Sequence, residues 1–472
     1  MTIDYLKCRT QDLEIPDENP FQNDKLGRSQ IADVLTDVAS FYGQSGCVMA
    51  LDGEWGAGKT TFVKMWEKSL QKKGFKTLYF NAWSSDYSDD ALMAIVSELQ
   101  ELSPESDTSK KLVEITGRIL LTVGKIAAKC LIGSGGDAVE ALLSEGTDIG
   151  KECLNAYVTQ KNTIEDFKKH VSKFVAFNAG EHPIVFFVDE LDRCSPRYAV
   201  SVLERIKHLF EIPNIIFVLA INKVQLCNAI QGYFGSANMD SNEYLRRFID
   251  IEYTLPAPKL ENYCEYLYNE YRFYDFFRSN QRMSSLSSYY DSEHFKTIAY
   301  TMCEIVQINL RQIDRIYAYA RLALMQFHPS NYLLPDVYFL LCFWKIVNPT
   351  FYKSIRNKDY NTQELLSKLE EIIPDGYFNQ AYSIYNNDYI LYAIAGFIYC
   401  YDITDIKNQR IVNPSIKANQ VDGKNSYNIK SRRFDNDKFY EALDNFYACN
   451  NRSFSYGLSY IFNRIDLLDS FK

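Results

Sequence analysis

The fold is decided by CVMALDGEWGAGKT, residues 47–60, in which an apolar run leads directly into a glycine-rich loop. The loop, from Gly53 to Thr60, follows the pattern G-x-x-x-x-G-K-S/T. Its glycines permit a tight turn whose successive N–H groups point at phosphate oxygens, and the helix that follows adds its N-terminus. The stretch therefore predicts a strand, a phosphate-binding loop and a helix, in this order.

The residues of this loop have predictable roles toward a nucleotide. Lys59 is expected to reach the outer phosphates, and the hydroxyl of Thr60 is expected to bind Mg2+. Thr61–Lys73 carries its apolar residues on one face and ends at Gly74, which is typical of an amphipathic helix. The residues expected to line the nucleotide are Gly53, Glu54, Trp55, Gly56, Ala57, Gly58, Lys59, Thr60 and Thr61. The loop thus predicts a site for a nucleoside triphosphate, which we take to be ATP.

A second apolar run ends in two carboxylates. Residues 184–190 read IVFFVDE, the form of a buried parallel strand with acids at its carboxyl end. Asp189 is expected to complete the magnesium shell opposite Thr60, and Glu190 to polarise the water that attacks the terminal phosphate. A nucleotide kinase has no need of the second acid, because its nucleophile is a bound substrate. The pair therefore favours hydrolysis over phosphoryl transfer to a small molecule.

Two further runs, Lys76–Trp83 and Asn214–Ile221, read as strands. Their alternation with helical segments predicts an α/β fold, an open parallel sheet flanked by helices with its ligands at the carboxyl ends of the strands. Asn222 follows the second of these runs. It could hydrogen-bond the terminal phosphate or the attacking water, or it could cap the helix expected over Lys223–Phe234, and the two roles are compatible.

Length and composition limit the classes of function. With 472 residues the chain is long enough for two or three domains. Its formal net charge of -9 excludes the class of proteins whose whole surface is positively charged and binds DNA or an anionic membrane. The 11 cysteines include no C-x-x-C pair, so reduced and mostly buried thiols are expected. Met1–Thr10 has no sustained apolar core, so no secretory signal is expected and the predicted location is cytoplasmic.

The interval between the two nucleotide-site motifs contains an apolar segment. Leu112–Gly133 is interrupted by charges at helical spacing, whereas a spanning helix needs about 20 mostly uncharged residues. We interpret it as an amphipathic helix that packs on the protein or lies on a membrane surface. Ile390–Cys400 is apolar but too short to span. No membrane span is therefore expected.

Four segments of the chain resemble the KAP family of P-loop NTPases. They are DKLGR at 24–28, FNAW at 80–83, DELDRC at 189–194, and the strand and turn over 217–226. The resemblance covers about residues 24–321 and implies that Asp189 binds magnesium and that Glu190 is catalytic. Family members commonly carry membrane helices between the two nucleotide-site motifs, and the charged insertion of this chain departs from that pattern. Relatives often have Asp where this chain has Asn222.

Two arginines are candidates for contact with the reacting phosphate. Arg247, beside Arg246, precedes the strand expected at Ile249–Thr254, and it could serve a neighbouring subunit as an arginine finger or form a surface salt bridge. Arg311 matches the Asn-x-Arg segment of the helical lid in KAP and AAA+-like proteins. It would sense the terminal phosphate there, or it is a cation on a helix surface. Either phosphate contact would couple hydrolysis to lid closure or to assembly of a homo-oligomer.

The expected organisation has three parts. They are a P-loop NTPase core over residues 1–258 with a helical insertion at about 84–180, a helical lid over 259–328, and a mainly helical domain over 329–472. The last part has no catalytic signature, so we expect it to recognise a protein partner or couple to an effector. Its aromatic residues are either core or platforms for stacking bases. Residues 417–438 are either a solvated loop or a mobile arm that contacts phosphates.

Three functions are compatible with these features. The first is Mg-dependent ATP hydrolysis that drives a conformational or assembly switch, and the resemblance adds a role in bacterial exclusion of phage or plasmids, which is antiviral defence. The second is a DNA-dependent ATPase motor or loader, suggested by the basic residues around Arg432. The third is a non-catalytic scaffold that nucleotide stabilises.

Overall fold

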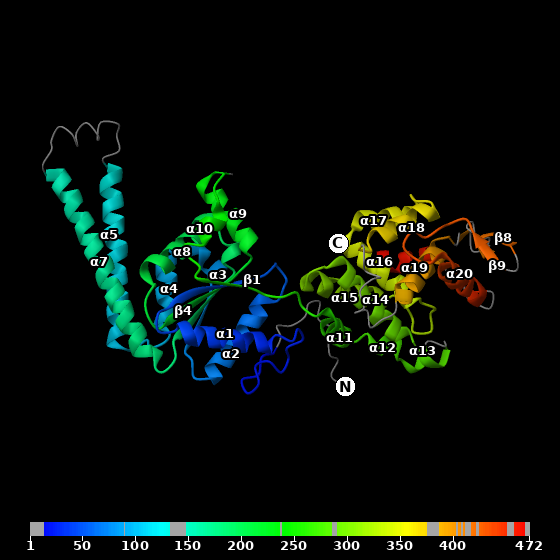
Figure 1. Ribbon diagram of the computed structural model, residues 1–472, viewed down its shortest axis with the longest axis horizontal. Coiled ribbons are helices and arrows are strands. Elements are labelled where there is room, and N and C mark those ends of the chain that lie inside the picture. The colour runs from blue at the N-terminus through cyan, green and yellow to red at the C-terminus, as the bar shows by residue number, and fades with distance from the viewer. Residues whose placement is uncertain are drawn as a thin grey trace. The chain divides into compact units, whose positions relative to one another are not determined.

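The computed structural model describes residues 14–88, 90–132, 148–236, 238–285, 290–374, 387–402, 405–406, 409–410, 417–421, 424–450 and 457–467. The described chain divides into two units, with the boundary between Ala257 and Pro258. Figure 1 shows both units and labels many of their elements.

The first unit is built on a five-stranded parallel sheet. Its strands are β1 (Cys47–Asp52), β2 (Thr77–Asn81), β3 (Ile184–Asp189), β4 (Ile215–Ile221) and β5 (Ile251–Thr254), in the spatial order β2-β3-β4-β1-β5. The side chains of β1, β3 and β4 are buried on both faces of the sheet, which explains why their sequences are continuous apolar runs. The carboxyl ends of all five strands lie at one edge, as the α/β prediction requires.

Helices cover both faces of this sheet (Figure 1). On one face lie α1 (Ser29–Tyr42) and α2 (Lys59–Lys72), whose Trp66 packs edge-on against Phe187 of β3. On the other face lie α4 (Ala91–Gln100), α8 (Pro196–Leu209) and α9 (Lys223–Phe234). There Phe186 of β3 contacts Phe217 of β4. The sheet therefore separates two apolar cores.

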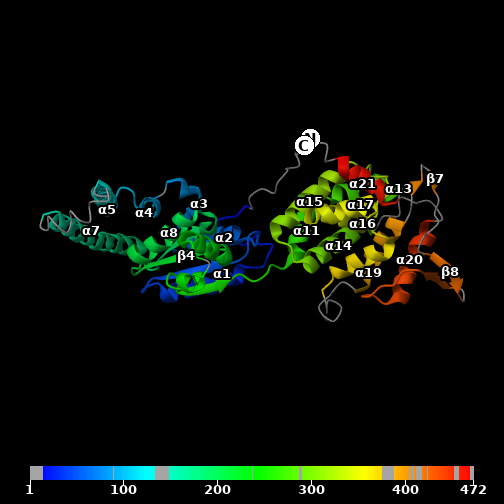
Figure 2. The ribbon, with the colours of Figure 1, turned by 90° about the horizontal axis from the view of Figure 1, so that it is seen from above.

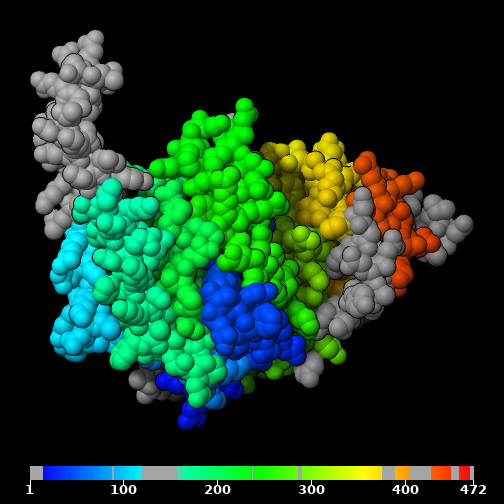
Figure 3. Space-filling model, turned by 60° about the vertical axis from the view of Figure 1, so that its left-hand side comes forward, coloured from blue at the N-terminus to red at the C-terminus, as the bar shows by residue number. Residues whose placement is uncertain are grey.

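The chain between β2 and β3 forms a long helical hairpin. Its helices, α5 (Asp107–Ile132) and α7 (Asp148–Ala179), lie side by side and extend away from the sheet in Figures 1 and 2. Figure 3 shows them at the surface in cyan and teal. Leu112 and Phe167 join the base of the hairpin to the core of the sheet. The prediction that this segment is a helix is confirmed up to Ile132, and Gly133 lies outside the described residues. In the part of the chain that the structure describes, no helix has the length and apolar character needed to cross a bilayer.

The strand expected over Lys76–Trp83 is shorter than predicted. β2 ends at Asn81, whose side chain accepts a hydrogen bond from the backbone N–H of Ser84 at 3.0 Å. This cap begins the short helix α3 (Ala82–Ser85), so Ala82 and Trp83 are helical. The other expected strands are confirmed, with small differences at their ends.

The second unit is mainly helical. Its longer helices are α11 (Leu260–Glu270), α14 (Asp291–Val306), α15 (Leu310–Leu324), α16 (Pro335–Val347), α17 (Pro349–Asn357), α18 (Thr362–Glu371), α19 (Asn387–Asp402), α20 (Asn436–Asn450) and α21 (Leu458–Ile465). α16 packs against α14, α15, α17 and α19, and its residues 337–344 are all buried. The aromatic residues of α16 are therefore core, the first of the two roles considered for them.

Residues 417–438 differ from the loop or arm that the sequence predicts. β8 (Lys417–Val421) and β9 (Lys424–Tyr427) form an antiparallel pair, and α20 begins at Asn436. The backbone N–H of Arg432 donates to the carboxylate of Glu370. The pairing of β8 with β9 and the hydrogen bond from Arg432 to Glu370 replace the expected loop. No local pattern of residue types predicts either of them.

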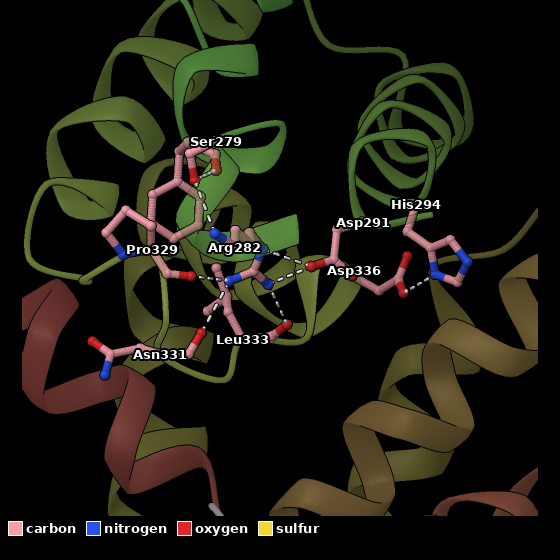
Figure 4. Close-up of polar contacts among 9 residues, drawn as sticks. Ser279, Arg282, Asp291, His294, Pro329, Asn331, Leu333 and Asp336 are labelled. Carbon is pink, nitrogen blue, oxygen red and sulfur yellow. Dashed lines mark hydrogen bonds and ion pairs between the residues drawn. The ribbon is translucent and has the colours of Figure 1, made fainter. Parts of the chain in front are cut away.

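A buried arginine ties together three segments of the second unit (Figure 4). Arg282 lies in α13 (Asn280–Ser285), and its Nε donates to the carboxylate of Asp291 at 2.8 Å. Its Nη1 donates to the carbonyls of Pro329 at 3.1 Å and Asn331 at 3.0 Å. Because a buried guanidinium is costly unless its donors are used, these contacts fix the chain between α15 and α16 against the start of α14.

Candidate nucleotide-binding site

β1 and α2 hold the glycine-rich loop between them, and we call Gly53–Thr60 the phosphate loop. β1 ends at Asp52, and α2 begins at Lys59. Gly56 and Gly58 have φ values of 81° and 80°, a conformation that is costly for a residue with a Cβ atom. The backbone conformation therefore favours glycine at positions 56 and 58. The loop N–H groups and the start of α2 make a site suited to phosphate.

Lys59 lies folded against the phosphate loop. Its ammonium donates to the carbonyl of Gly53 at 2.6 Å and to that of Glu54 at 3.1 Å. Burial lowers the pKa of Lys59, while the carboxylates of Asp192 and Asp189 act in the opposite direction. The lysine and the acidic end of β3 are thus close enough to interact electrostatically. Thr60 follows at the start of α2 and is partly buried.

A direct hydrogen bond joins the phosphate loop to the chain after β3. The indole N–H of Trp55 donates to the carboxylate of Asp192, which lies in the short helix η2 (Leu191–Arg193). Asp192 is buried, so its charge needs such partners. The loop and the acidic strand end meet at one place, although 137 residues separate Trp55 from Asp192 along the chain.

Asp189 is buried at the end of β3. Its Oδ2 accepts a hydrogen bond from the hydroxyl of Tyr79 at 2.8 Å, and its Oδ1 accepts one from the backbone N–H of Glu190 at 2.8 Å. Burial, with Asp189 beside it, raises the pKa of Tyr79 and keeps the phenol a donor. Tyr79 is a site residue that sequence reasoning missed, because its aromatic ring in a strand signals only packing.

The donors present fit a magnesium ion. Mg2+ prefers oxygen ligands and is commonly held by one or two carboxylates together with the phosphates of a substrate. Thr60 offers a hydroxyl and Asp189 a carboxylate whose orientation is set by two hydrogen bonds. Within the described ranges, no three His, Cys, Asp or Glu side chains gather into a metal site of their own.

Glu190 follows β3 with a φ of 61°, which is unusual for a residue other than glycine. Its Oε2 accepts a hydrogen bond from Nδ2 of Asn81 at 3.1 Å, and its Oε1 pairs with Nη1 of Arg193 at 2.7 Å. Asn81 faces Asp189 in the register of β2 and β3, so the neighbouring strand delivers this amide to the site. Backbone strain of this kind concentrates at functional sites.

Asn222 follows β4, the strand that lies between β1 and β3. Its side chain accepts a hydrogen bond from the backbone N–H of Gln225 at 3.2 Å and caps α9. The N–H of Gly53 donates to the carbonyl of Ile221 at 3.1 Å, which brings Asn222 next to the phosphate loop. The capping role is observed, and contact with the nucleotide stays a prediction.

The two candidate arginines are exposed and lie in different units. Arg247 stands in the turn before β5, beside Arg246, whose guanidinium pairs with Glu243 at 3.1 Å. Arg311 is near the start of α15 in the second unit. Their contacts with a nucleotide stay predictions.

Arg28 belongs to the site, although sequence reasoning quoted its DKLGR segment without a role. Its buried guanidinium donates to the carbonyl of Ala57 in the phosphate loop at 2.8 Å and to that of Pro256 after β5 at 3.3 Å. Burial lowers the pKa of Arg28, and the carboxylate of Asp24 opposes this shift. Arg28 therefore supports the phosphate loop from the protein interior. The DKLGR motif drew attention to Arg28 but did not indicate that Arg28 contacts the phosphate loop.

One protein-family model and two solved structures are similar to this chain. The model of the KAP family P-loop domain matches residues 27–322. Two solved structures are similar at low identity. The Aeropyrum pernix ORC2 protein in ADPNP-ADP complexes is 12% identical, with 90% of this chain and 95% of that chain covered and a TM-score of 0.36. The replication initiator DnaA bound to AMPPCP and single-stranded DNA is 11% identical, with 76% and 97% covered and a TM-score of 0.26. No curated protein matches the sequence.

Proposed function

This chain belongs to the KAP family of P-loop NTPases, and we propose that it hydrolyses ATP with Mg2+. The observation that carries the proposal is the hydrogen bond from Trp55 to Asp192, which brings the phosphate loop against the acidic end of β3. Nucleotide hydrolysis needs a phosphate cradle, a carboxylate for the metal and a group that orients water. Candidates for all three lie at one edge of this sheet, which supports the proposal.

Each residue of the site has a distinct task in this proposal. The backbone of the phosphate loop and Lys59 bind the phosphates, and Thr60 and Asp189 would hold Mg2+, which would neutralise phosphate charge. Glu190 takes the proton of the attacking water as a general base. Asn222, Arg247 and Arg311 remain candidates for contact with the terminal phosphate.

The hydrolysis is proposed to drive a conformational or assembly switch. Two units with separate helices and cores support this idea, because ATP and its products can stabilise different arrangements of such parts. The family relation supports a role in defence against phage. Phage plating on bacteria that express wild type or Glu190→Gln tests that role, and equal plating on both would contradict it.

Measurements of ATP binding and turnover test the hydrolysis itself. Lys59→Ala is expected to lose ATP binding, because no other side chain of the phosphate loop supplies its charge. Glu190→Gln is expected to bind ATP with Mg2+ and to lower kcat by about 10²–10⁴-fold, the usual contribution of a general base. Lys72→Ala, at the exposed far end of the same helix α2, is the control and should behave as wild type. Equal turnover by wild type and Glu190→Gln would refute the assignment of the base.

A further inference from the structure

The carboxylate of Glu190 has both of its oxygens occupied by donors of the protein. Arg193 pairs with Oε1 at 2.7 Å, and Asn81 donates to Oε2 at 3.1 Å. The ion pair is largely withdrawn from solvent, with 30% of the Arg193 side chain and 15% of the Glu190 side chain exposed. Solvent and salt therefore weaken it less than a pair on the open surface.

Arg193 has a second support besides Glu190. Its guanidinium lies over the ring of Trp83, 5.6 Å from the ring centroid, as a cation–π contact. Trp83 belongs to α3, which begins directly after Asn81, the other partner of Glu190. Trp83 is 54% exposed. The last residue of β2 thus contributes an amide that binds Glu190, and α3 contributes a ring that contacts the arginine.

A further tie fixes this arrangement. Asp86, in the 3-10 helix η1 (Asp86–Ser88) that follows α3, accepts hydrogen bonds from the backbone N–H and the hydroxyl of Ser195, both at 2.8 Å. Ser195 stands two residues after Arg193. The segments after β2 and β3 are consequently joined on either side of the Glu190–Arg193 pair, which holds the pair in one geometry.

We propose that Arg193 is a positioning residue that restrains Glu190 and limits basal ATP turnover. The inference rests on the proposed hydrolysis. A general base must offer an oxygen to the attacking water within hydrogen-bond reach, and the guanidinium turns the carboxylate toward itself and occupies an acceptor position. Release of Arg193 frees Glu190 for the water. ATP binding depends on the phosphate loop and is not altered.

Steady-state kinetics of Arg193 variants test this restraint. Arg193→Met removes the cation but keeps an apolar chain against Trp83, and it is expected to raise kcat by about fivefold, the scale of one partly exposed ion pair, with KM for ATP unchanged. Arg193→Lys keeps a cation and should stay near wild type. Arg197→Met is the matched control, because Arg197 is exposed four residues further on. The double variant Arg193→Met/Glu190→Gln should turn over as slowly as Glu190→Gln.

The outcomes separate this inference from the proposed function. If wild type hydrolyses ATP and Arg193→Met has an equal or lower kcat, the inference about Arg193 is wrong. The proposed function is then unaffected. ATP binding without hydrolysis in wild type and every variant would overturn the proposed function, and the role of Arg193 with it. If Arg193→Met does not fold, Trp83→Leu removes the ring that supports the guanidinium, and a kcat no higher than that of wild type would overturn the inference in its place.

Discussion

Hydrogen bonds to two buried carboxylates from distant parts of the chain set the geometry of the nucleotide site. Tyr79 donates to Asp189, and Trp55 donates to Asp192. Each bond satisfies a buried carboxylate that would otherwise destabilise the fold. Because the acceptors are charged, these are stronger than bonds between neutral groups. The same contacts therefore fix Asp189 at the carboxyl end of β3 and Asp192 just beyond it.

The bond from Tyr79 to Asp189 is testable by removal of a single oxygen. Tyr79→Phe keeps the ring and leaves Oδ2 of Asp189 without this donor, so we expect a loss of about 1.5–3 kcal/mol in the free energy of unfolding. Tyr87→Phe is the control, since Tyr87 is 90% exposed and the same change should leave stability as it is. Urea denaturation of both variants measures the difference. Equal midpoints for the two would contradict a stabilising role for the hydrogen bond.

At the level of elements, the parallel sheet and the phosphate loop together make the site. Parallel pairing places the residues that follow β1, β3 and β4 at one edge of the sheet. The loop then has to turn sharply between β1 and α2, which it does through glycines with positive φ. A strand followed by a helix occurs in many folds. Here the two glycines with positive φ shape the loop between them so that it suits phosphate.

A pair of glycine substitutions separates backbone strain from helix propensity. Gly58→Ala forces a Cβ atom into a left-handed conformation, so we expect a loss of about 1–2 kcal/mol in stability together with weaker ATP binding. Gly232→Ala, in the exposed last turn of α9 where a Cβ meets open space, should stabilise by up to about 0.5–1 kcal/mol. Thermal unfolding with and without ATP compares the variants. A Gly58→Ala protein as stable as wild type would show that the loop does not need this glycine.

For the whole molecule, the division into two units means that each has apolar packing of its own. In the first unit Trp66 is fully buried between α2 and the sheet. In the second, Phe295 of α14 is fully buried and contacts Phe273 and Phe339. Units with separate cores are expected to unfold as separate cooperative blocks.

Calorimetry of two core variants tests this separation. Trp66→Ala is expected to cost about 3–5 kcal/mol and to lower the Tm of one unfolding transition only. Phe295→Ala should cost a similar amount and lower the Tm of the other transition. ATP with Mg2+ should raise the Tm of the transition that Trp66→Ala affects, because the phosphate loop lies in that unit. A single transition that both substitutions shift equally would contradict the prediction.

Signals in neighbouring residues made much of this protein predictable. The apolar runs of β3 and β4, the helix of α9 and the glycine loop are local patterns, and each of these elements is observed where it is expected. Local reasoning placed the end of β2 too late, because the Asn81 cap competes with the strand and depends on the position of Ser84. It also read a loop where β8 and β9 pair.

Local sequence patterns were enough to predict the class of fold, the phosphate loop and the acids at the end of β3, because strand length, glycine conformation and apolar periodicity act over a few neighbouring residues. The contacts that hold those parts in place depend on the folded chain. The partners of Tyr79, Trp55 and Arg28 are 110, 137 and 29 or more residues away. Such pairs form because burial in one folded unit forces polar groups to find partners, and no local pattern encodes which group that will be.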